Sequence, residues 1–208
     1  MRIFIIPKVD DEYSQEKEFV EPGVRILRFQ FGPNKYLRKE LLWPYLDHLT
    51  ERLISHYKKN KKPNFIHAHY ADAGYVGVKL SKSLNVPLIF TGHSLGREKK
   101  RKLLDTGLKN NQIEKFYSIS KRIEAEEKAL KSADFVVTST KQELLHQYSQ
   151  YSSFSPHKAK VIPPGVDHIK FHHIHSTTET AEIDNMMKPF LKDSSKPCLL
   201  YTSDAADE

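Results

Sequence analysis

Short apolar runs recur along the chain, and longer stretches with helical spacing lie between them. The short runs are rich in β-branched and aromatic residues and predict strands at 2–7, 24–29, 65–69, 87–91, 134–138 and 160–163. Helical spacing of apolar residues predicts helices at 40–58, near 73–84 and at about 111–131. The spacing of Thr140 and Glu143 is that of a capping box, so one more helix is expected to start there.

This order of elements predicts a fold class. An acidic loop is expected over residues 9–22, between the first two strands. Beyond it, strands and helices alternate, and no internal repeat interrupts them. The sequence therefore predicts an α/β fold, a Rossmann-like parallel sheet with helices on both faces.

Composition narrows the class of protein. The chain has 208 residues, 38% of them hydrophobic, with 11 Phe and 10 Tyr, which is enough for one core. The single cysteine, Cys198, excludes a disulfide framework and favours a reducing compartment. No apolar run approaches the roughly 18 residues of a membrane helix. We expect a cytoplasmic protein that does not span a membrane.

The charge admits several kinds of anionic partner. The chain carries 33 Lys+Arg and 26 Asp+Glu, a formal net charge of +7. This balance suits nucleic acid and sugar phosphates equally well. The basic runs at 58–62 and 99–102 are the candidate patches, and the first has no interleaved aromatic residues for base stacking. A nucleic-acid-binding module is therefore kept only as a remote alternative.

Two loops at strand ends are expected to form the functional site, because ligands of parallel sheets bind at the carboxyl ends of the strands. The loops are residues 67–74 and 91–96. Glycines gather in or near them, at positions 74, 77, 92, 96 and 107. Glycine lets backbone N–H groups approach a ligand, and a helix N-terminus favours an anion.

Several side chains in this region could carry chemistry. His93 follows a strand and could orient a substrate or donate to an oxygen, or it could simply pack. Ser94 lies beside it without the Gly-x-Ser-x-Gly turn of a serine hydrolase. Lys99, Lys121 and Arg122 could surround one phosphate, or they could be ordinary surface cations.

Histidine spacing raises the question of a metal. His67 and His69 point to the same face of a predicted strand, but no Cys or carboxylate pattern completes a ligand set. A hydrogen-bonding role at the strand end fits them better. The histidine-dense segment 171–175 is a weak metal signal on its own. We expect no metal site.

Several motifs resemble those of sucrose-phosphate synthases. They run in order over about residues 20–175 and are KYLRKELLWP (35–44), FIHAHYADAG (65–74), TGHSLGREK (91–99), KRIEAEE (121–127), VTSTKQE (137–143), VIPPGV (161–166) and FHHI (171–174). The resemblance implies a retaining glycosyltransferase of the GT-B fold, in which two Rossmann-like domains face a cleft. Such enzymes transfer glucose from UDP-glucose to fructose 6-phosphate, giving sucrose 6-phosphate and UDP.

The resemblance also implies roles for individual residues. Lys39, Lys99 and Arg122 would bind the acceptor phosphate, and Lys121 would assist. His93 would lie near the reacting centre, with the acceptor bound by Tyr70, Asp72, Gly74 and Ser94. No cofactor is implied; UDP-glucose is a donor substrate, and magnesium could associate with the nucleotide without being required.

The same comparison gives an expected domain organisation. Residues 1–175 would form the acceptor-binding domain without the family's first strand and its glycine-rich Gly-Gly-Gln loop. Residues 176–200 would be a linker and the start of the donor domain, and 201–208 a tail foreign to the fold. We expect this chain to be inactive by itself. The related alternatives are sucrose synthase, which takes free fructose, and a mannosylfructose-phosphate synthase, which changes the donor sugar.

Overall fold

The computed structural model describes residues 2–4, 16–33, 35, 37–167 and 185. The chain divides into two units, Met1–Pro163 and Pro164–Glu208. The fold and the site below belong to the first unit. The predicted boundary at 175, the histidine-rich segment 171–175 and the tail 201–208 lie outside the described residues, as does the linker 176–200 apart from Asn185. Those assignments stay predictions.

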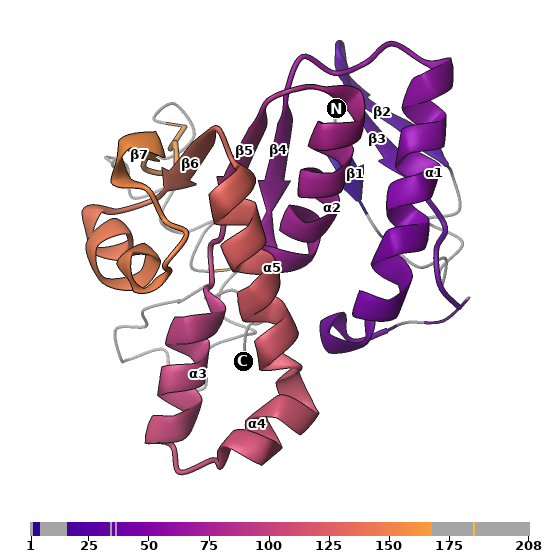
Figure 1. Ribbon diagram of the computed structural model, residues 1–208. Helices are drawn as coiled ribbons and strands as arrows, with labels where there is room; N and C mark the ends of the chain where they lie inside the picture. Colours follow the sequence, from indigo (N-terminus) through magenta and orange to yellow (C-terminus); the bar gives the residue numbers. More distant parts are fainter. Residues whose placement is uncertain (1, 5–15, 34, 36, 168–184, 186–208) are drawn as a thin grey trace. The chain divides into compact units, whose positions relative to one another are not determined.

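The central element is a parallel sheet of four strands in the order β4-β5-β6-β7 (Figure 1). Its strands are β4 (Ile66–His69), β5 (Leu88–Thr91), β6 (Phe135–Thr138) and β7 (Ala159–Val161). Neighbouring strands are consecutive in the chain, as expected when helices connect parallel strands. The predicted α/β class and the parallel sheet are confirmed.

A second, three-stranded sheet corrects the prediction for the first part of the chain. Its order is β1-β3-β2, with β1 (Arg2–Phe4) parallel to β3 (Val24–Arg28) and β2 (Lys17–Glu21) antiparallel to it. We expected only a loop where β2 lies. The strand was missed because charged residues flank its short apolar pair, whereas a hairpin gains its order from the partner strand.

The helices follow the predicted pattern with shifted boundaries. They are α1 (Leu46–Lys59), α2 (Tyr70–Leu84), α3 (Gly96–Asp105), α4 (Asn110–Tyr117) and α5 (Ile119–Ser132). A 3-10 turn, η2 (Lys39–Leu41), precedes α1. The single helix expected at 111–131 is two helices, α4 and α5, broken at Ser118, which takes a left-handed conformation with φ 45°.

The helix expected after Thr140 starts as predicted but is irregular. Thr140 Oγ1 accepts the N–H of Glu143 at 3.1 Å, as in a capping box. The segment then continues as a π-helical stretch, η4 (Glu143–Gln147), and a 3-10 turn, η5 (Tyr148–Gln150). This irregularity turns Tyr148 and Tyr151 inward, where both are buried.

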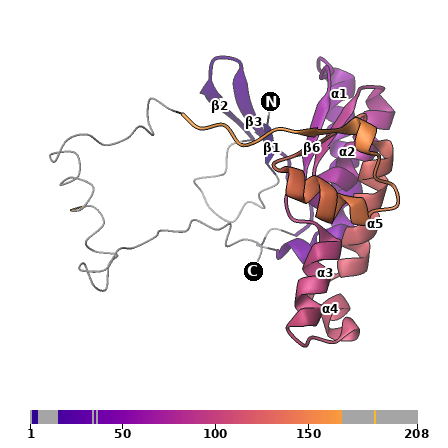
Figure 2. The same ribbon diagram turned by 90° about the vertical axis from the view of Figure 1, so that its left-hand side faces the viewer.

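Apolar side chains form two adjoining clusters. Figures 1 and 2 show α2 between α1 and α5 on one side of the sheet. One cluster joins α1 and α2 and includes Phe31, Leu46, Leu49, Leu53, Tyr57, Val76, Leu80 and Leu84. The other joins the sheet, α5 and the segment after β6, and includes Ala68, Leu88, Phe90, Leu95, Ala129, Leu130, Val136, Tyr148 and Tyr151.

Glycine allows α2 to lie close to the sheet. A Cβ at Gly74 would lie 2.8 Å from Phe90 and 3.1 Å from Ala129, and one at Gly77 would lie 3.0 Å from Ala68. Both glycines lie inside α2 and are buried. The loop predicted over residues 67–74 is therefore wrong, because its second half is the first turn of a helix that packs on the sheet.

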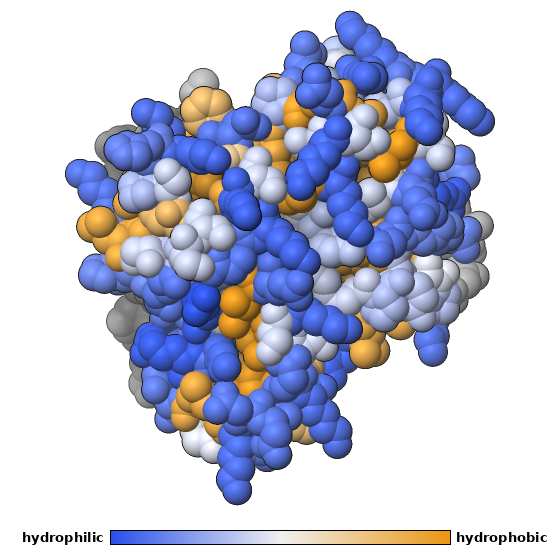
Figure 3. All heavy atoms as spheres, in the orientation of Figure 1, coloured by the Kyte–Doolittle hydropathy of each residue, from blue (hydrophilic) through white to orange (hydrophobic). Residues whose placement is uncertain are grey.

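The face of the molecule seen in Figure 3 is mostly hydrophilic, with apolar side chains showing mainly in seams between elements. Within the described part of the chain, no helix combines the length and the apolar character that crossing a bilayer requires.

We expect Gly74→Ala to destabilise the fold by about 1–3 kcal/mol, because the added methyl group overpacks the contact of α2 with Phe90 and Ala129. Chemical denaturation would measure the change. Gly165→Ala is the matched control, since a Cβ there meets nothing within 4 Å. Equal stability of the two variants would contradict the close approach of α2.

Candidate functional site

Aromatic rings form a row at the carboxyl ends of β4 and β5. The His67 and His69 ring centres are 4.1 Å apart, those of His69 and His93 are 5.0 Å apart, and those of Tyr70 and His93 are 4.7 Å apart. His69 Nδ1 is 2.7 Å from His93 Nε2, and His67 Nε2 is 2.9 Å from Thr91 Oγ1. Desolvation lowers the pKa of His67, and the nearby His93 adds to this effect.

Unusual backbone geometry presents two of these rings. Tyr70 has φ 70° and His93 has φ 54°, so both lie in the left-handed region that non-glycine residues rarely adopt. Tyr70 begins α2 directly after β4, and His93 lies in the loop directly after β5. Strained residues of this kind persist only where their surroundings hold them, and they cluster at functional sites.

A buried carboxylate holds the loop that carries His93. Both oxygens of Glu126 accept the N–H of Gly96 at 3.0 Å, at the start of α3, and the Tyr151 hydroxyl also donates to Glu126. The Tyr151 oxygen accepts the N–H of Arg97 at 3.0 Å. Burial raises the pKa of Glu126, while its hydrogen bonds and the Arg122 charge act in the opposite direction.

The other end of the loop is fixed by a second tyrosine. Tyr148 Oη accepts the N–H of Gly92 at 2.7 Å. A Cβ at Gly92 would lie 3.0 Å from this hydroxyl and 2.4 Å from Leu95. The loop is thus held at both ends by residues of the segment after β6.

Arg122 is part of the same buried network. Its Nε donates to Glu126 at 3.1 Å, and its Nη2 donates to the carbonyl oxygen of Ser94 and lies 3.2 Å from Ser94 Oγ. The residue is only 8% exposed. These bonds engage Nε and Nη2 and leave Nη1 for another partner. Arg122 and Ser94, both candidates from the sequence, are therefore brought together by a direct contact.

Asp72 lies within electrostatic range of two candidate cations. Burial raises the pKa of Asp72, whereas hydrogen bonds from the first turn of α2 and the charges of Arg122 and Lys39 act to lower it. The three charged residues come from α2, α5 and η2. The structure thus brings Lys39, Asp72 and Arg122 to the same region as His93.

The remaining candidates lie around this centre. Lys99 is on α3, with Nζ 4.9 Å from the centre of the Tyr117 ring. Lys121 is exposed on α5, next to Arg122. Gly74 does not line an open surface, because it is buried against Phe90 and Ala129. Its contribution is to the packing of α2.

The backbone N–H groups of the loop at 91–96 were expected to be available to an anion, but the structure shows two of them bonded to side chains. The N–H groups of Gly92 and Gly96 are bonded to Tyr148 and Glu126. Side-chain carboxylates also occupy the first turns of the nearby helices: Asp72 in α2, Glu126 at α3, and Glu114 on Ser120 of α5. An anion at this site would therefore be bound by side-chain cations and not by helix N-termini.

The two basic runs are partly used within their own helices. In the run at 99–102, Arg101 pairs with Glu98 and Asp105 one turn away. In the run at 58–62, Lys58 and Lys59 lie in the last turn of α1, and Lys62 Nζ donates to the carbonyl oxygen of Leu84 at 3.3 Å. Cations are favourable at such helix ends.

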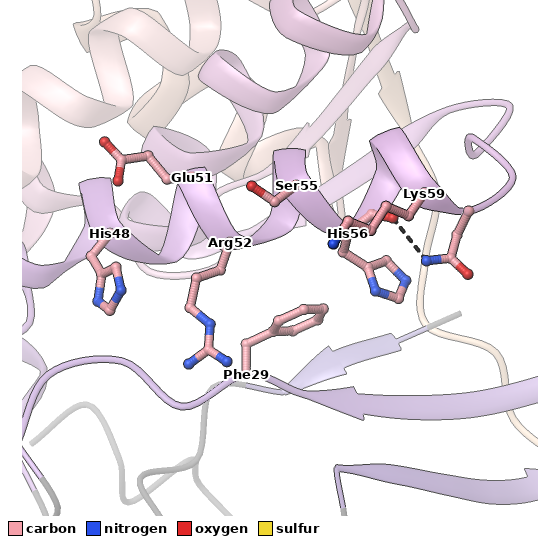
Figure 4. A pocket seen from close by; sticks show the side chains of 8 residues that line it. Phe29, His48, Glu51, Arg52, Ser55, His56 and Lys59 are labelled. Atoms are coloured by element: carbon pink, nitrogen blue, oxygen red, sulfur yellow. Dashed lines mark hydrogen bonds between the residues drawn. The ribbon is translucent and has the colours of Figure 1, made fainter.

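A hollow of about 400 Å³ lies away from these candidates, between α1 and the end of β3 (Figure 4). In Figure 4, Phe29, Arg52 and His56 extend into the space between the helix and the strand. Its lining is mixed, with an aromatic ring and acidic and basic groups. Lys59 of the basic run at 58–62 lines it, but none of the expected substrate-binding residues does.

The expectation of no metal site stays a prediction. In the part of the chain that the structure covers, no three His, Cys, Asp or Glu side chains converge as metal ligands. His69 and His93 direct ring nitrogens at each other. The histidines of segment 171–175 lie outside the described residues.

Sequence reasoning missed Glu126, Tyr148 and Tyr151, which shape the site without forming its surface. One signal was available for Glu126: it lies on the apolar face of α5, between Ala125 and Ala129, and is completely buried. A carboxylate on an apolar stripe needs partners. The tyrosines had no such signal, because their inward direction depends on the irregular helix after Thr140.

We expect Tyr151→Phe to destabilise the protein by about 1–3 kcal/mol. The change leaves the Arg97 N–H and the buried Glu126 carboxylate each without one partner. Thermal and denaturant unfolding would measure it. Tyr75→Phe is the control, since the Tyr75 hydroxyl bonds Asp47 on the exposed surface. A Tyr151 variant no less stable than the control would contradict the network.

Glu127, the residue after Glu126, should make the free energy of unfolding depend on pH. Desolvation opposes the effect, but hydrogen bonds from Arg97, Ser152 and Ser153 lower the pKa of Glu127 to about 2, from an ordinary value of 4.5. A lowered pKa stabilises the fold above the ordinary value, and this contribution is lost as the pH falls from 4.5 to about 2. The stability gap between wild type and Glu127→Gln should therefore be largest above pH 4.5 and close toward pH 2.

The control for this titration is Glu124→Gln on the same helix. Glu124 is exposed and pairs with Lys128. The difference in stability between Glu124→Gln and wild type should be small over the whole pH range. A Glu127→Gln gap that does not change with pH would refute the role assigned to this carboxylate.

Comparison with known proteins gives a consistent picture. Residues 15–178 match the sequence profile of the sucrose synthase first GT-B domain. A probable sucrose-phosphate synthase 2 of Arabidopsis thaliana is 38% identical over 81% of the chain, and a sucrose-phosphate synthase of Spinacia oleracea is 38% identical over 84%. The chain spans about a fifth of the length of these curated relatives, 20% in each case.

A solved structure has the same fold. A sucrose-phosphate synthase of Thermosynechococcus elongatus superposes with a TM-score of 0.69 and 22% identity, covering 86% of this chain and 41% of that one. The profile match extends over most of the chain and includes every element that positions His93, Asp72 and Arg122. The chain belongs to the family of the sucrose synthase first GT-B domain, a family of glycosyltransferase domains.

Proposed function

We propose that this chain is the acceptor-binding domain of an enzyme that transfers glucose from UDP-glucose to fructose 6-phosphate, with retention, to give sucrose 6-phosphate and UDP. The observation that supports the proposal is the buried Arg122, which bonds Ser94 next to His93 in the loop after β5, with Asp72 within electrostatic range of both Arg122 and Lys39. The relatives are named sucrose-phosphate synthases, which supports a phosphorylated sugar as the product.

The charged and polar side chains of the site suit a sugar phosphate, which has an anionic phosphate at one end and uncharged hydroxyl groups at the other. Lys39, Lys99 and the free end of the Arg122 guanidinium would bind the phosphate, with Lys121 at the rim. Each charge-assisted hydrogen bond contributes about 1.5–3 kcal/mol. His93 would offer one ring nitrogen and Tyr70 a hydroxyl to the sugar, and Asp72 can accept hydrogen bonds from sugar hydroxyls.

The family profile and the relatives differ on one point, which defines the main alternative. The profile is that of sucrose synthase, whose acceptor is free fructose, whereas the relatives are named sucrose-phosphate synthases. The grouped cations favour the phosphorylated acceptor. A mannosylfructose-phosphate synthase would keep this acceptor site and differ in the donor sugar.

We expect the chain to bind fructose 6-phosphate about 10- to 100-fold more tightly than fructose, as one charge-assisted bond to the phosphate requires. Calorimetric titration of both sugars would measure this ratio. Lys39→Ala and Lys99→Ala should each weaken fructose 6-phosphate binding about tenfold and leave the weak binding of fructose unchanged. Equal affinity for the two sugars would contradict the phosphorylated acceptor and favour the sucrose synthase alternative.

The control for these variants is Lys128→Ala. Lys128 is an exposed cation of α5 that pairs with Glu124, so its loss changes the net charge equally without touching the site. Arg122 is less suited to this test, because its replacement also removes the contacts to Ser94 and Glu126. In the enzyme that contains this domain, UDP release from UDP-glucose should require fructose 6-phosphate.

A further inference from the structure

The hydrogen bond between His69 and His93 has a consequence for the state of both rings. Nδ1 of His69 lies 2.7 Å from Nε2 of His93. A bond between two imidazole nitrogens needs a hydrogen on one and a lone pair on the other. If His69 donates, both rings carry their hydrogen on Nδ1; if His93 donates, both carry it on Nε2. In either case the two neutral rings share the same tautomer.

The backbone makes His69 the fixed member of this pair. It lies in β4, where it is in register with Thr91 of the neighbouring strand. His93 lies in the loop after β5 with a left-handed backbone. A strand inside a sheet holds a side chain more firmly than a loop does. The hydrogen bond therefore fixes the ring of His93, which lies in a loop, relative to strand β4.

Neighbouring rings restrict the pair further. His67 stacks on His69 with an interplanar angle of 34°, and His67 Nε2 is itself bonded to Thr91 Oγ1. The ring of Tyr70 lies 4.7 Å from that of His93, also at an interplanar angle of 34°. The His93 ring thus contacts two neighbouring rings, while its side chain remains exposed. Such an arrangement leaves few rotamers open to it.

We propose that His69 is a positioning residue that holds His93 in one tautomer and one orientation at the acceptor site. The inference rests on the proposed function, in which His93 contacts the acceptor sugar. The bond to His69 occupies Nε2 of His93, so Nδ1 is the ring nitrogen left to meet a substrate. Its protonation is set by the direction of the bond to His69.

Nitrogen-15 spectra of the labelled histidines would test the pair directly, because the two ring nitrogens differ in shift according to which one carries the hydrogen. In the wild-type chain at pH 7.5, His69 and His93 should each show one tautomer, and the same one. His69→Leu should release His93 to a mixture of tautomers. His69→Asn should restore the hydrogen bond to His93 Nε2, since its side-chain amide reaches the position of Nδ1 and can either donate or accept there.

Binding of fructose 6-phosphate gives the second readout. His69→Leu should weaken it about fivefold, the loss expected from one neutral hydrogen bond, and His69→Asn should bind within twofold of wild type. His146→Asn is the matched control, an exposed histidine of η4. It should change neither the tautomer of His93 nor the affinity.

The outcomes separate this inference from the proposed function. Mixed tautomers in wild type, or different tautomers on the two rings, would contradict the proposed hydrogen bond between His69 and His93. So would a His69→Leu chain that binds fructose 6-phosphate as wild type does. If no variant, wild type included, binds this sugar, the proposed function fails, and the spectra still decide whether His69 fixes His93.

Discussion

The buried carboxylate of Glu126 is the constraint on which the geometry of the site depends. It accepts the Gly96 N–H, the Tyr151 hydroxyl and Arg122 Nε, and so connects the loop after β5, the segment after β6 and α5. Removing a carboxylate from water is costly unless hydrogen bonds and an opposite charge compensate for it. The compensation requires all three segments at once, so the loop takes one conformation.

Because of this network, the basic residues around it do not all have the same role. Arg122 contributes to structure through Nε and Nη2 and can offer only its remaining nitrogen to a ligand. Lys39 lies on η2 and Lys99 on α3. Because carboxylates already occupy the first turns of α2, α3 and α5, the proposed binding of a phosphate would depend on the positions of these lysine side chains.

Much of the fold followed from local pattern. Short apolar runs and helical periodicity predicted β4, β5, β6, α1 and the parallel sheet, because both kinds of pattern are local in the sequence. The hairpin strand β2 and the break at Ser118 were missed, since both depend on partners distant in sequence or on one left-handed residue. At the site, residue chemistry named His93, Lys99 and Arg122 only as candidates, and their roles stay predictions. The tyrosines that shape the loop could not be named, because their positions depend on tertiary contacts.

The two tyrosines lie far along the chain from the loop they hold: Tyr148 bonds Gly92 across 56 residues, and Tyr151 bonds Arg97 across 54. During synthesis, β4, β5 and α2 emerge well before either hydroxyl exists. The loop carrying His93 therefore cannot take its final shape until the chain has been synthesised past Tyr151.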